Sequence, residues 1–115
     1  MKVEPPKGER SRHKRKYAQG ELEQDRSFYF RGPTNKLNLR AQNLATFVQL
    51  AEGLDDDTWL FHLRRGDYST WLRQAVKDAA LAEQIERIEQ DESLAPDESR
   101  AHIKKAIEDK YTAPA

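Results

Sequence analysis

The sequence predicts a mainly α-helical protein: a compact bundle of four to five helices with a short N-terminal extended or β-hairpin segment and a disordered basic arm. Apolar residues recur at intervals of three and four over most of the chain after Asn38, as in amphipathic helices. An alternating pattern is confined to one stretch, residues 27–39. Since 115 residues suit one domain, we assign residues 1–20 to the arm and residues 21–113 to a single helical domain.

The arm differs from the rest of the chain in charge and in apolar content. Residues 1–16 carry seven basic and two acidic side chains, whereas residues 17–115 carry 13 basic and 18 acidic ones. Residues 1–20 contain no Leu, Ile, Phe or Trp, so they cannot offset the entropy lost on ordering. A basic arm is a candidate nucleic-acid contact, and the alternative is a solvated tail. The candidate residues are Arg10, Arg12, Lys14, Arg15 and Lys16.

The alternating stretch, SFYFRGPTNKLNL, predicts a hairpin or an extended segment laid over the helices. Phe28 and Phe30 would share one face, and Leu37 and Leu39 likewise. The residues between them, Gly-Pro-Thr-Asn at 32–35, are typical of a turn, and Asn tolerates a left-handed backbone. An isolated two-stranded hairpin is marginal in water, so both alternatives stay open.

We expect a first helix from an N-cap at Asn38 to about Glu52, ended by Gly53. Its apolar residues at helical spacing are Ala41, Leu44, Val48 and Ala51. The next segment opens with three aspartates that suit a helix N-terminus, which predicts a short helix from about Asp56 to Arg65, closed by Gly66.

Three further helix signals follow. Asp67 or Ser69 is expected to cap a third helix that contains Trp71. Asp78 is expected to cap its continuation or a fourth helix, because Leu81, Ile85 and Ile88 recur at helical intervals after it. Pro96 suits the first position of a final helix, and it precedes acidic residues that suit a first turn.

The stretch HLRRGDYSTW, residues 62–71, holds the candidate ligand-binding residues. Arginines beside aromatic rings can bind a phosphate and stack on a sugar or a ring. Alternatively, the arginines lie at a helix C-terminus, where cations are favoured and where the aspartates at 55–57 pair with them. The candidates are His62, Arg64, Arg65, Asp67, Tyr68, Trp71 and Arg73.

His62 and Asp67 also suggest an enzyme in which Asp67 orients a histidine general base. The competing interpretation, which we favour, is that Asp67 caps the third helix while His62 forms a hydrogen bond at the junction. The sequence has no cysteine, no HExxH and no glycine-rich phosphate loop. We therefore expect no metal, no cofactor and no catalysis.

No segment approaches the roughly 18 apolar residues that a membrane helix needs. We expect a soluble, cytoplasmic protein that does not contact a membrane.

The pattern formed by His62, Gly66, Asp67, Tyr68 and Trp71 resembles a bacterial and archaeal domain of unknown function. FYFRGPTNKLNLRAQNL and SRAHIKKAIEDKYTAPA are similar to the C-terminal appendage of some haloacid-dehalogenase-type phosphatases of sugar-phosphate metabolism. The resemblance covers residues 15–113 and also takes in Leu72, Asp78, Leu81 and Ala82.

The resemblance implies a free-standing accessory module. The phosphatases use a DxD nucleophile with magnesium, and the aspartates at 55–57 lack the strand-end setting of that motif. The leading hypothesis is thus a non-catalytic interaction or regulatory module. It would dock on a sugar-phosphate enzyme, such as a haloacid-dehalogenase-type phosphatase, or bind a phosphorylated sugar.

Overall fold

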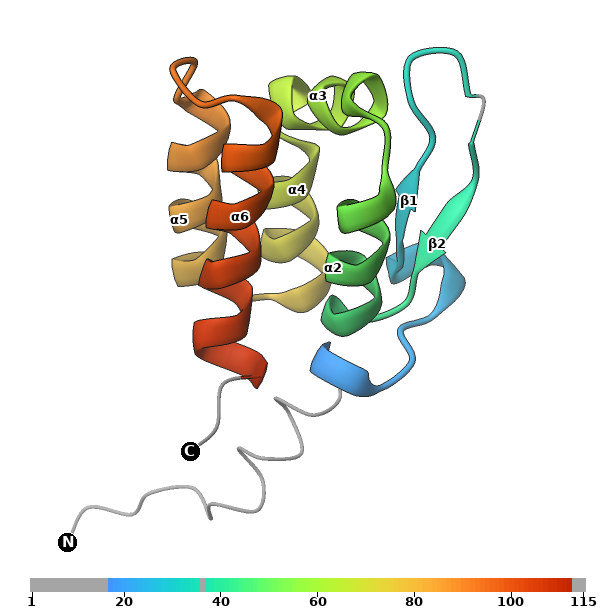
Figure 1. Cartoon of the computed structure of the whole chain (residues 1–115). Helices are drawn as coiled ribbons and strands as arrows, with labels where there is room; N and C mark the ends of the chain where they lie inside the picture. Colours follow the sequence, from blue (N-terminus) through green and yellow to red (C-terminus); the bar gives the residue numbers. More distant parts are fainter. Residues whose placement is uncertain (1–16, 36, 113–115) are drawn as a thin grey trace, which may run out of the picture.

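The computed structural model describes residues 17–35 and 37–112, and it confirms a mainly helical, compact fold (Figure 1). The candidate arm residues from Arg10 to Lys16 lie outside the described residues. Residues 17–19 are helical and Ala18 is buried, so the described fold includes residues 17–20, which the sequence analysis assigned to the arm.

The alternating stretch forms a hairpin. Strand β1 (Phe28–Phe30) pairs antiparallel with β2 (Leu39–Ala41), with Phe28 opposite Ala41. Phe28 and Phe30 are both buried, as their alternation predicts, whereas Leu39 is exposed. Asn35 in the connecting turn has a φ of 55°, the left-handed backbone that the sequence suggested.

The first long helix, α2 (Leu44–Gly53), begins later than predicted. Asn43 caps it, because its Oδ1 accepts the Thr46 N–H at 2.7 Å. The expected cap at Asn38 is wrong, since residues 39–41 pair with β1 instead of continuing the helix. The predicted end at Gly53 is confirmed.

Helix α3 (Asp56–Arg65) has the predicted bounds. Asp55 caps it through the Thr58 amide and hydroxyl. At its end Gly66 takes a φ of 72°, and its N–H donates to the carbonyls of the last turn. This left-handed residue reverses the chain directly into the next helix.

Helix α4 (Asp67–Trp71) runs on into a π-helical turn, η2 (Leu72–Val76). The expected caps Asp67 and Ser69 are wrong, because Gly66 is the N-cap residue and the Asp67 carboxylate bonds His62. The π-helical turn ends at Lys77, which has a φ of 61°.

Helices α5 (Ala79–Gln90) and α6 (Pro96–Ile107) follow, and α6 leads into a second π-helical turn, η3 (Glu108–Thr112). Asp78 caps α5 as predicted, accepting the Leu81 N–H at 3.0 Å. It also accepts hydrogen bonds from Lys110 and Tyr111, which fasten η3 to the start of α5. Burial acts to raise the pKa of Asp78, but these three hydrogen bonds outweigh it and lower that pKa.

The helices stand side by side, with α3 across one end of the bundle and the hairpin beside α2 (Figure 1). A short 3-10 turn, η1 (Gln24–Arg26), leads into the hairpin. Between these elements lies a cluster of aromatic rings whose centroids are 4.5–5.6 Å from at least one neighbour. Its members are Phe28, Phe30, Phe47, Trp59, Tyr68 and Trp71.

The left-handed backbone at Lys77 generates a first prediction. Residues with a Cβ strain this conformation, so Lys77→Gly should raise the free energy of unfolding by about 0.5–1 kcal/mol, measured by urea denaturation. Gln84→Gly, on the exposed side of α5, should instead lower it by about 1 kcal/mol. Equal destabilisation by both variants would contradict the assignment of strain to Lys77.

Candidate functional site

His62 joins the hairpin to the start of α4. Its Nε2 accepts the backbone N–H of Arg31 at 3.1 Å and of Gly32 at 3.3 Å. Its Nδ1 lies 2.9 Å from Asp67 Oδ2. Because a backbone N–H can only donate, Nε2 is unprotonated and Nδ1 carries the proton that is donated to Asp67. Both nitrogens of this buried ring are therefore engaged.

This geometry bears on the enzyme alternative. A general base needs a lone pair that reaches a substrate proton, whereas the Nε2 lone pair of His62 faces two backbone amides. Asp67 also accepts the Arg65 Nε–H at 3.2 Å. Among residues 17–35 and 37–112, no group of three or more His, Cys, Asp or Glu is placed to hold a metal ion.

The two predicted aromatic ligand contacts belong to the core. Tyr68 is fully buried, stacks on Trp59 and donates its hydroxyl to the Trp59 carbonyl at 2.9 Å. Burial raises the pKa of Tyr68 far above its usual range. Trp71 is 7% exposed and donates its indole N–H to the Arg26 carbonyl. Neither ring is placed where it could stack on a ligand, which corrects the expectation that they form a binding face.

The three predicted arginines do not converge on one point. Arg73 pairs with Glu86 on α5 at 3.3 Å. Arg64 lines a groove together with Glu89, Asp91 and Glu92, in which carboxylates outnumber its guanidinium. Arg64 and Arg65 both line a further groove, beside Glu86 and Glu89, and Arg65 also reaches a groove on the hairpin side of α3.

The groove on the hairpin side of α3, which we call the arginine groove, has a volume of about 490 Å³. Its walls include Tyr29 and Arg31 from the hairpin and Phe61 and Arg65 from α3, and Asp67 also lines it. The Arg31 guanidinium carbon lies 4.8 Å from the Tyr29 ring centroid, and that of Arg65 lies 5.0 Å from the Phe61 ring centroid. Each cation is thus held over an aromatic face.

The charge of the arginine groove is positive. Asp67 is its one carboxylate, against two guanidinium groups. Arg31 forms no ion pair with any carboxylate in the described part of the chain, and Arg65, which is 61% exposed, shares Asp67 with His62. An anion in this groove would therefore meet one guanidinium that has no carboxylate partner among the described residues and one that shares Asp67 with His62.

His62, Arg65 and Asp67 line this groove and were predicted as site residues, whereas Tyr29, Arg31 and Phe61 were not. The alternation that buries Phe28 and Phe30 also directs Tyr29 and Arg31 to the opposite face, so the pattern contained the hairpin half of this groove. The residues that α3 contributes to the groove could not be predicted in the same way, because their place depends on how α3 packs on β1.

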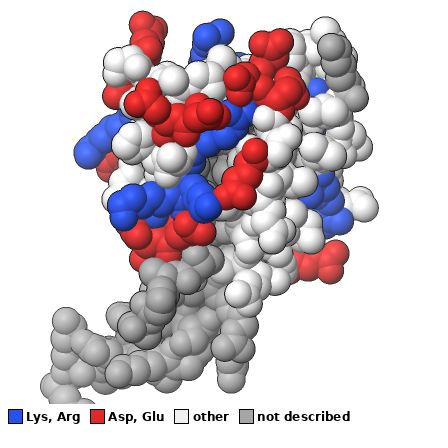
Figure 2. All heavy atoms as spheres, in the orientation of Figure 1, with Lys and Arg blue, Asp and Glu red and all other residues white. Residues whose placement is uncertain are grey.

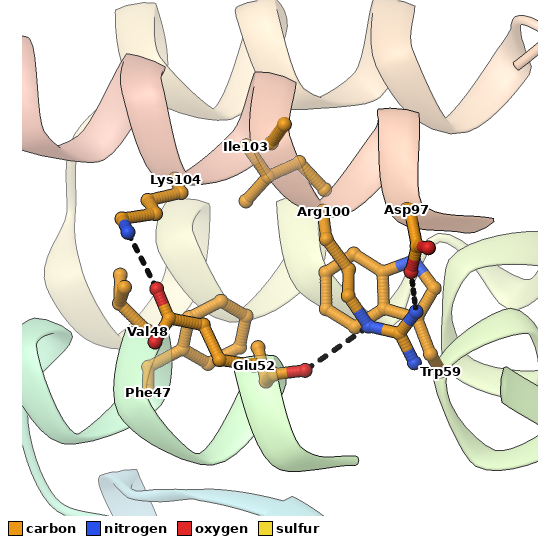
Figure 3. A pocket seen from close by; sticks show the side chains of 10 residues that line it. Phe47, Val48, Glu52, Trp59, Asp97, Arg100, Ile103 and Lys104 are labelled. Carbon is orange, nitrogen blue, oxygen red and sulfur yellow. Dashed lines mark hydrogen bonds and ion pairs between the residues drawn. The ribbon is translucent and has the colours of Figure 1, made fainter. Parts of the chain in front are cut away.

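A second cavity, the α2–α6 pocket, has a volume of about 280 Å³ and mostly apolar walls. Figure 3 shows its lining: Phe47 and Val48 project from α2, Ile103 projects from α6, and Trp59 closes one side. Glu52 and Lys104 form an ion pair across the pocket between α2 and α6. No sequence motif indicated this pocket.

Arg100 forms a fixed wall of the α2–α6 pocket. Its guanidinium donates to the carbonyls of Ala51 at 3.0 Å and Leu54 at 2.6 Å, at the C-terminal end of α2. It also pairs with Asp56 and Asp97, and its guanidinium carbon lies 5.5 Å from the Trp59 ring centroid. With these partners the side chain is 11% exposed, which indicates a structural role.

Comparisons with known proteins give no relative: no family model matches the chain, and neither the curated proteins nor the solved structures contain a match. The resemblance to a phosphatase appendage stays a prediction. In the described part of the chain, no helix has both the length and the apolar character to cross a lipid bilayer.

Glu89 caps α4 from a neighbouring helix. Its Oε2 accepts the Ser69 N–H at 3.2 Å. Among the described residues, its Oε1 is the one buried side-chain polar atom without a hydrogen-bond partner. Burial raises the pKa of Glu89 above its ordinary value, although hydrogen bonds from Ser69 and from the Tyr68 amide oppose this.

The raised pKa predicts how Glu89 affects stability. The raised pKa means that the folded protein binds a proton at Glu89 more tightly than the unfolded chain does. The stability contributed by this proton is complete at a pH below the unfolded pKa and is lost as pH rises through the folded pKa. Glu89→Gln, which mimics the protonated form, should therefore gain stability relative to wild type as pH rises from about 4 towards neutrality.

Urea denaturation at several pH values measures this difference. Glu83→Gln, on the exposed side of α5, controls for the loss of one negative charge. A Glu89→Gln difference that stays constant or falls with rising pH would contradict the burial of this carboxylate.

Proposed function

We propose that this domain is a non-catalytic binding module that holds a phosphorylated sugar, or a similar small phosphorylated molecule, in the arginine groove. The observation that carries the proposal is the convergence of Arg31 and Arg65 on one groove, each above an aromatic ring. Guanidinium groups bind phosphate oxygens through paired N–H donors.

The aromatic side chains support the same ligand class. The Tyr29 ring is held in place because its hydroxyl donates to the Gln24 carbonyl at 2.8 Å. Phe61 is half-buried beside the groove. Fixed ring faces next to cations suit a ligand that has an anionic group at one end and a ring at the other.

His62 supports a binding role over a catalytic one. It anchors Arg31 through the Arg31 backbone N–H, and it anchors Asp67, which in turn contacts Arg65. The imidazole thus holds the Arg31 backbone and the carboxylate that contacts the Arg65 guanidinium, while its own nitrogens stay occupied. This arrangement favours a positioning role for the residue that the sequence suggested as a base.

Docking onto a haloacid-dehalogenase-type phosphatase stays a prediction from the resemblance. Nucleic-acid binding through the arm also stays a prediction, since the basic residues concerned lie outside the described part of the chain.

An amide NMR titration with glucose 6-phosphate tests the proposal. We expect shifts at residues 29–33 and 61–67, and Arg31→Gln or Arg65→Gln should weaken binding roughly 10-fold because a charge-assisted hydrogen bond is lost. Arg87→Gln, an exposed arginine outside the groove, should leave the affinity unchanged. The proposal fails if glucose binds as well as its phosphate, or if the shifts lie elsewhere.

A further inference from the structure

We propose that the α2–α6 pocket is a second binding site, which takes a free amino acid with a branched apolar or aromatic side chain. The site is independent of the arginine groove, because the two share no lining residue. The inference rests on an apolar interior beside surface charges of both signs.

The interior of the pocket is suited to one apolar side chain. Its walls include Phe47, Val48, Ala51 and Ile103, and Trp59 provides an aromatic side. Ligand pockets are typically lined by such groups, with a small number of polar groups that set the orientation of the ligand. A volume of about 280 Å³ accommodates a molecule the size of leucine or phenylalanine.

The charges around the pocket match those of a zwitterion. Lys104 and Glu52 are 43% and 55% exposed, and their ion pair spans the gap between α2 and α6. Asp97 adds a second carboxylate that is 94% exposed. The ligand carboxylate would pair with Lys104, and its ammonium group would pair with Glu52, while Asp97 keeps its bond to Arg100. Exposed ion pairs contribute little stability, so this exchange of partners has a low cost.

Arg100 does not take part in this exchange. Its three guanidinium nitrogens already donate to two backbone carbonyls and two aspartates. It therefore keeps its place beside Trp59 whether or not the pocket is filled. Lys104 is the remaining cation among the residues that line the pocket, so the ligand carboxylate would bind to Lys104.

The surrounding surface has the same mixed character. Side chains of both charges alternate over α5 and α6, whereas the surface over α2 is largely uncharged (Figure 2). The side chain of a partner protein would bring only neutral peptide groups to these charges, whereas a free amino acid brings a carboxylate and an ammonium group that complement Lys104 and Glu52. The free amino acid satisfies both the apolar interior and the charged surroundings.

The test is an amide NMR titration of the whole chain with L-phenylalanine, L-leucine, glycine and N-acetyl-L-phenylalaninamide. We expect L-phenylalanine and L-leucine to shift the amides of α2 and α6 that line the pocket. Glycine, which lacks a side chain, should bind at least 10-fold more weakly. The blocked phenylalanine, which lacks both charges, should also bind at least 10-fold more weakly.

Two variants and one control variant assign the site. Ala101→Leu places a larger side chain at an exposed lining position of α6 and should abolish the shifts. The matched control is His102→Leu, on the exposed part of the same helix and outside the pocket, and it should bind as wild type does. In Lys104→Gln, L-phenylalanine should bind no more tightly than phenethylamine, which has no carboxylate.

Three results would overturn the proposal. The first is the absence of shifts in α2 and α6 with either apolar amino acid. The second is binding to Ala101→Leu that equals wild type. The third is equal affinity for the blocked phenylalanine, which would assign the pocket to a side chain of a partner protein.

Discussion

The imidazole of His62 is the contact on which the arrangement of the hairpin, α3 and α4 depends. Its Nε2 accepts hydrogen bonds from the two amides at the start of the hairpin turn, and its Nδ1–H donates to Asp67 at the start of α4. The Gly66 turn makes this possible, because it brings Asp67 back beside the last turn of α3. Without the imidazole, the amide N–H groups of Arg31 and Gly32 would lose their acceptor. Gly32 is buried, and a buried donor left unsatisfied costs about 1–3 kcal/mol.

We call these contacts of His62 with Arg31, Gly32 and Asp67 the His62 bridge. The residues around the bridge fall into two groups, those that stabilise the fold and those that remain available for binding. Tyr68 and Trp71 pack in the aromatic core and use their polar atoms on backbone carbonyls. The exposed cations lie around that core, and His62 holds the Arg31 backbone and, through Asp67, contacts Arg65, while both of its ring nitrogens are already hydrogen-bonded. The arginine groove is therefore a consequence of how the hairpin is attached to α3.

Local patterns in the sequence predicted the helices well, because the residues that cap a helix or end it act on neighbours a few positions away. Asp55, Gly66, Asp78 and Pro96 occupy the predicted boundaries. The start of α2 was misplaced because strand pairing with β1, a contact between distant residues, determines the structure of residues 39–41. The candidate site was only partly predicted. Arg65 and Asp67 line a groove, but its other wall comes from a segment about 30 residues earlier, and local patterns do not specify that contact.

The most direct test of the bridge is the protonation pattern of the His62 ring, measured by ¹⁵N NMR of the imidazole at neutral pH. The structure predicts that Nδ1 carries the proton, and that Nε2 is unprotonated and coupled through hydrogen bonds to the amides of Arg31 and Gly32. A proton on Nε2, or rapid exchange between the two tautomers, would contradict the bridge. It would also remove the physical basis for placing both arginines around one groove.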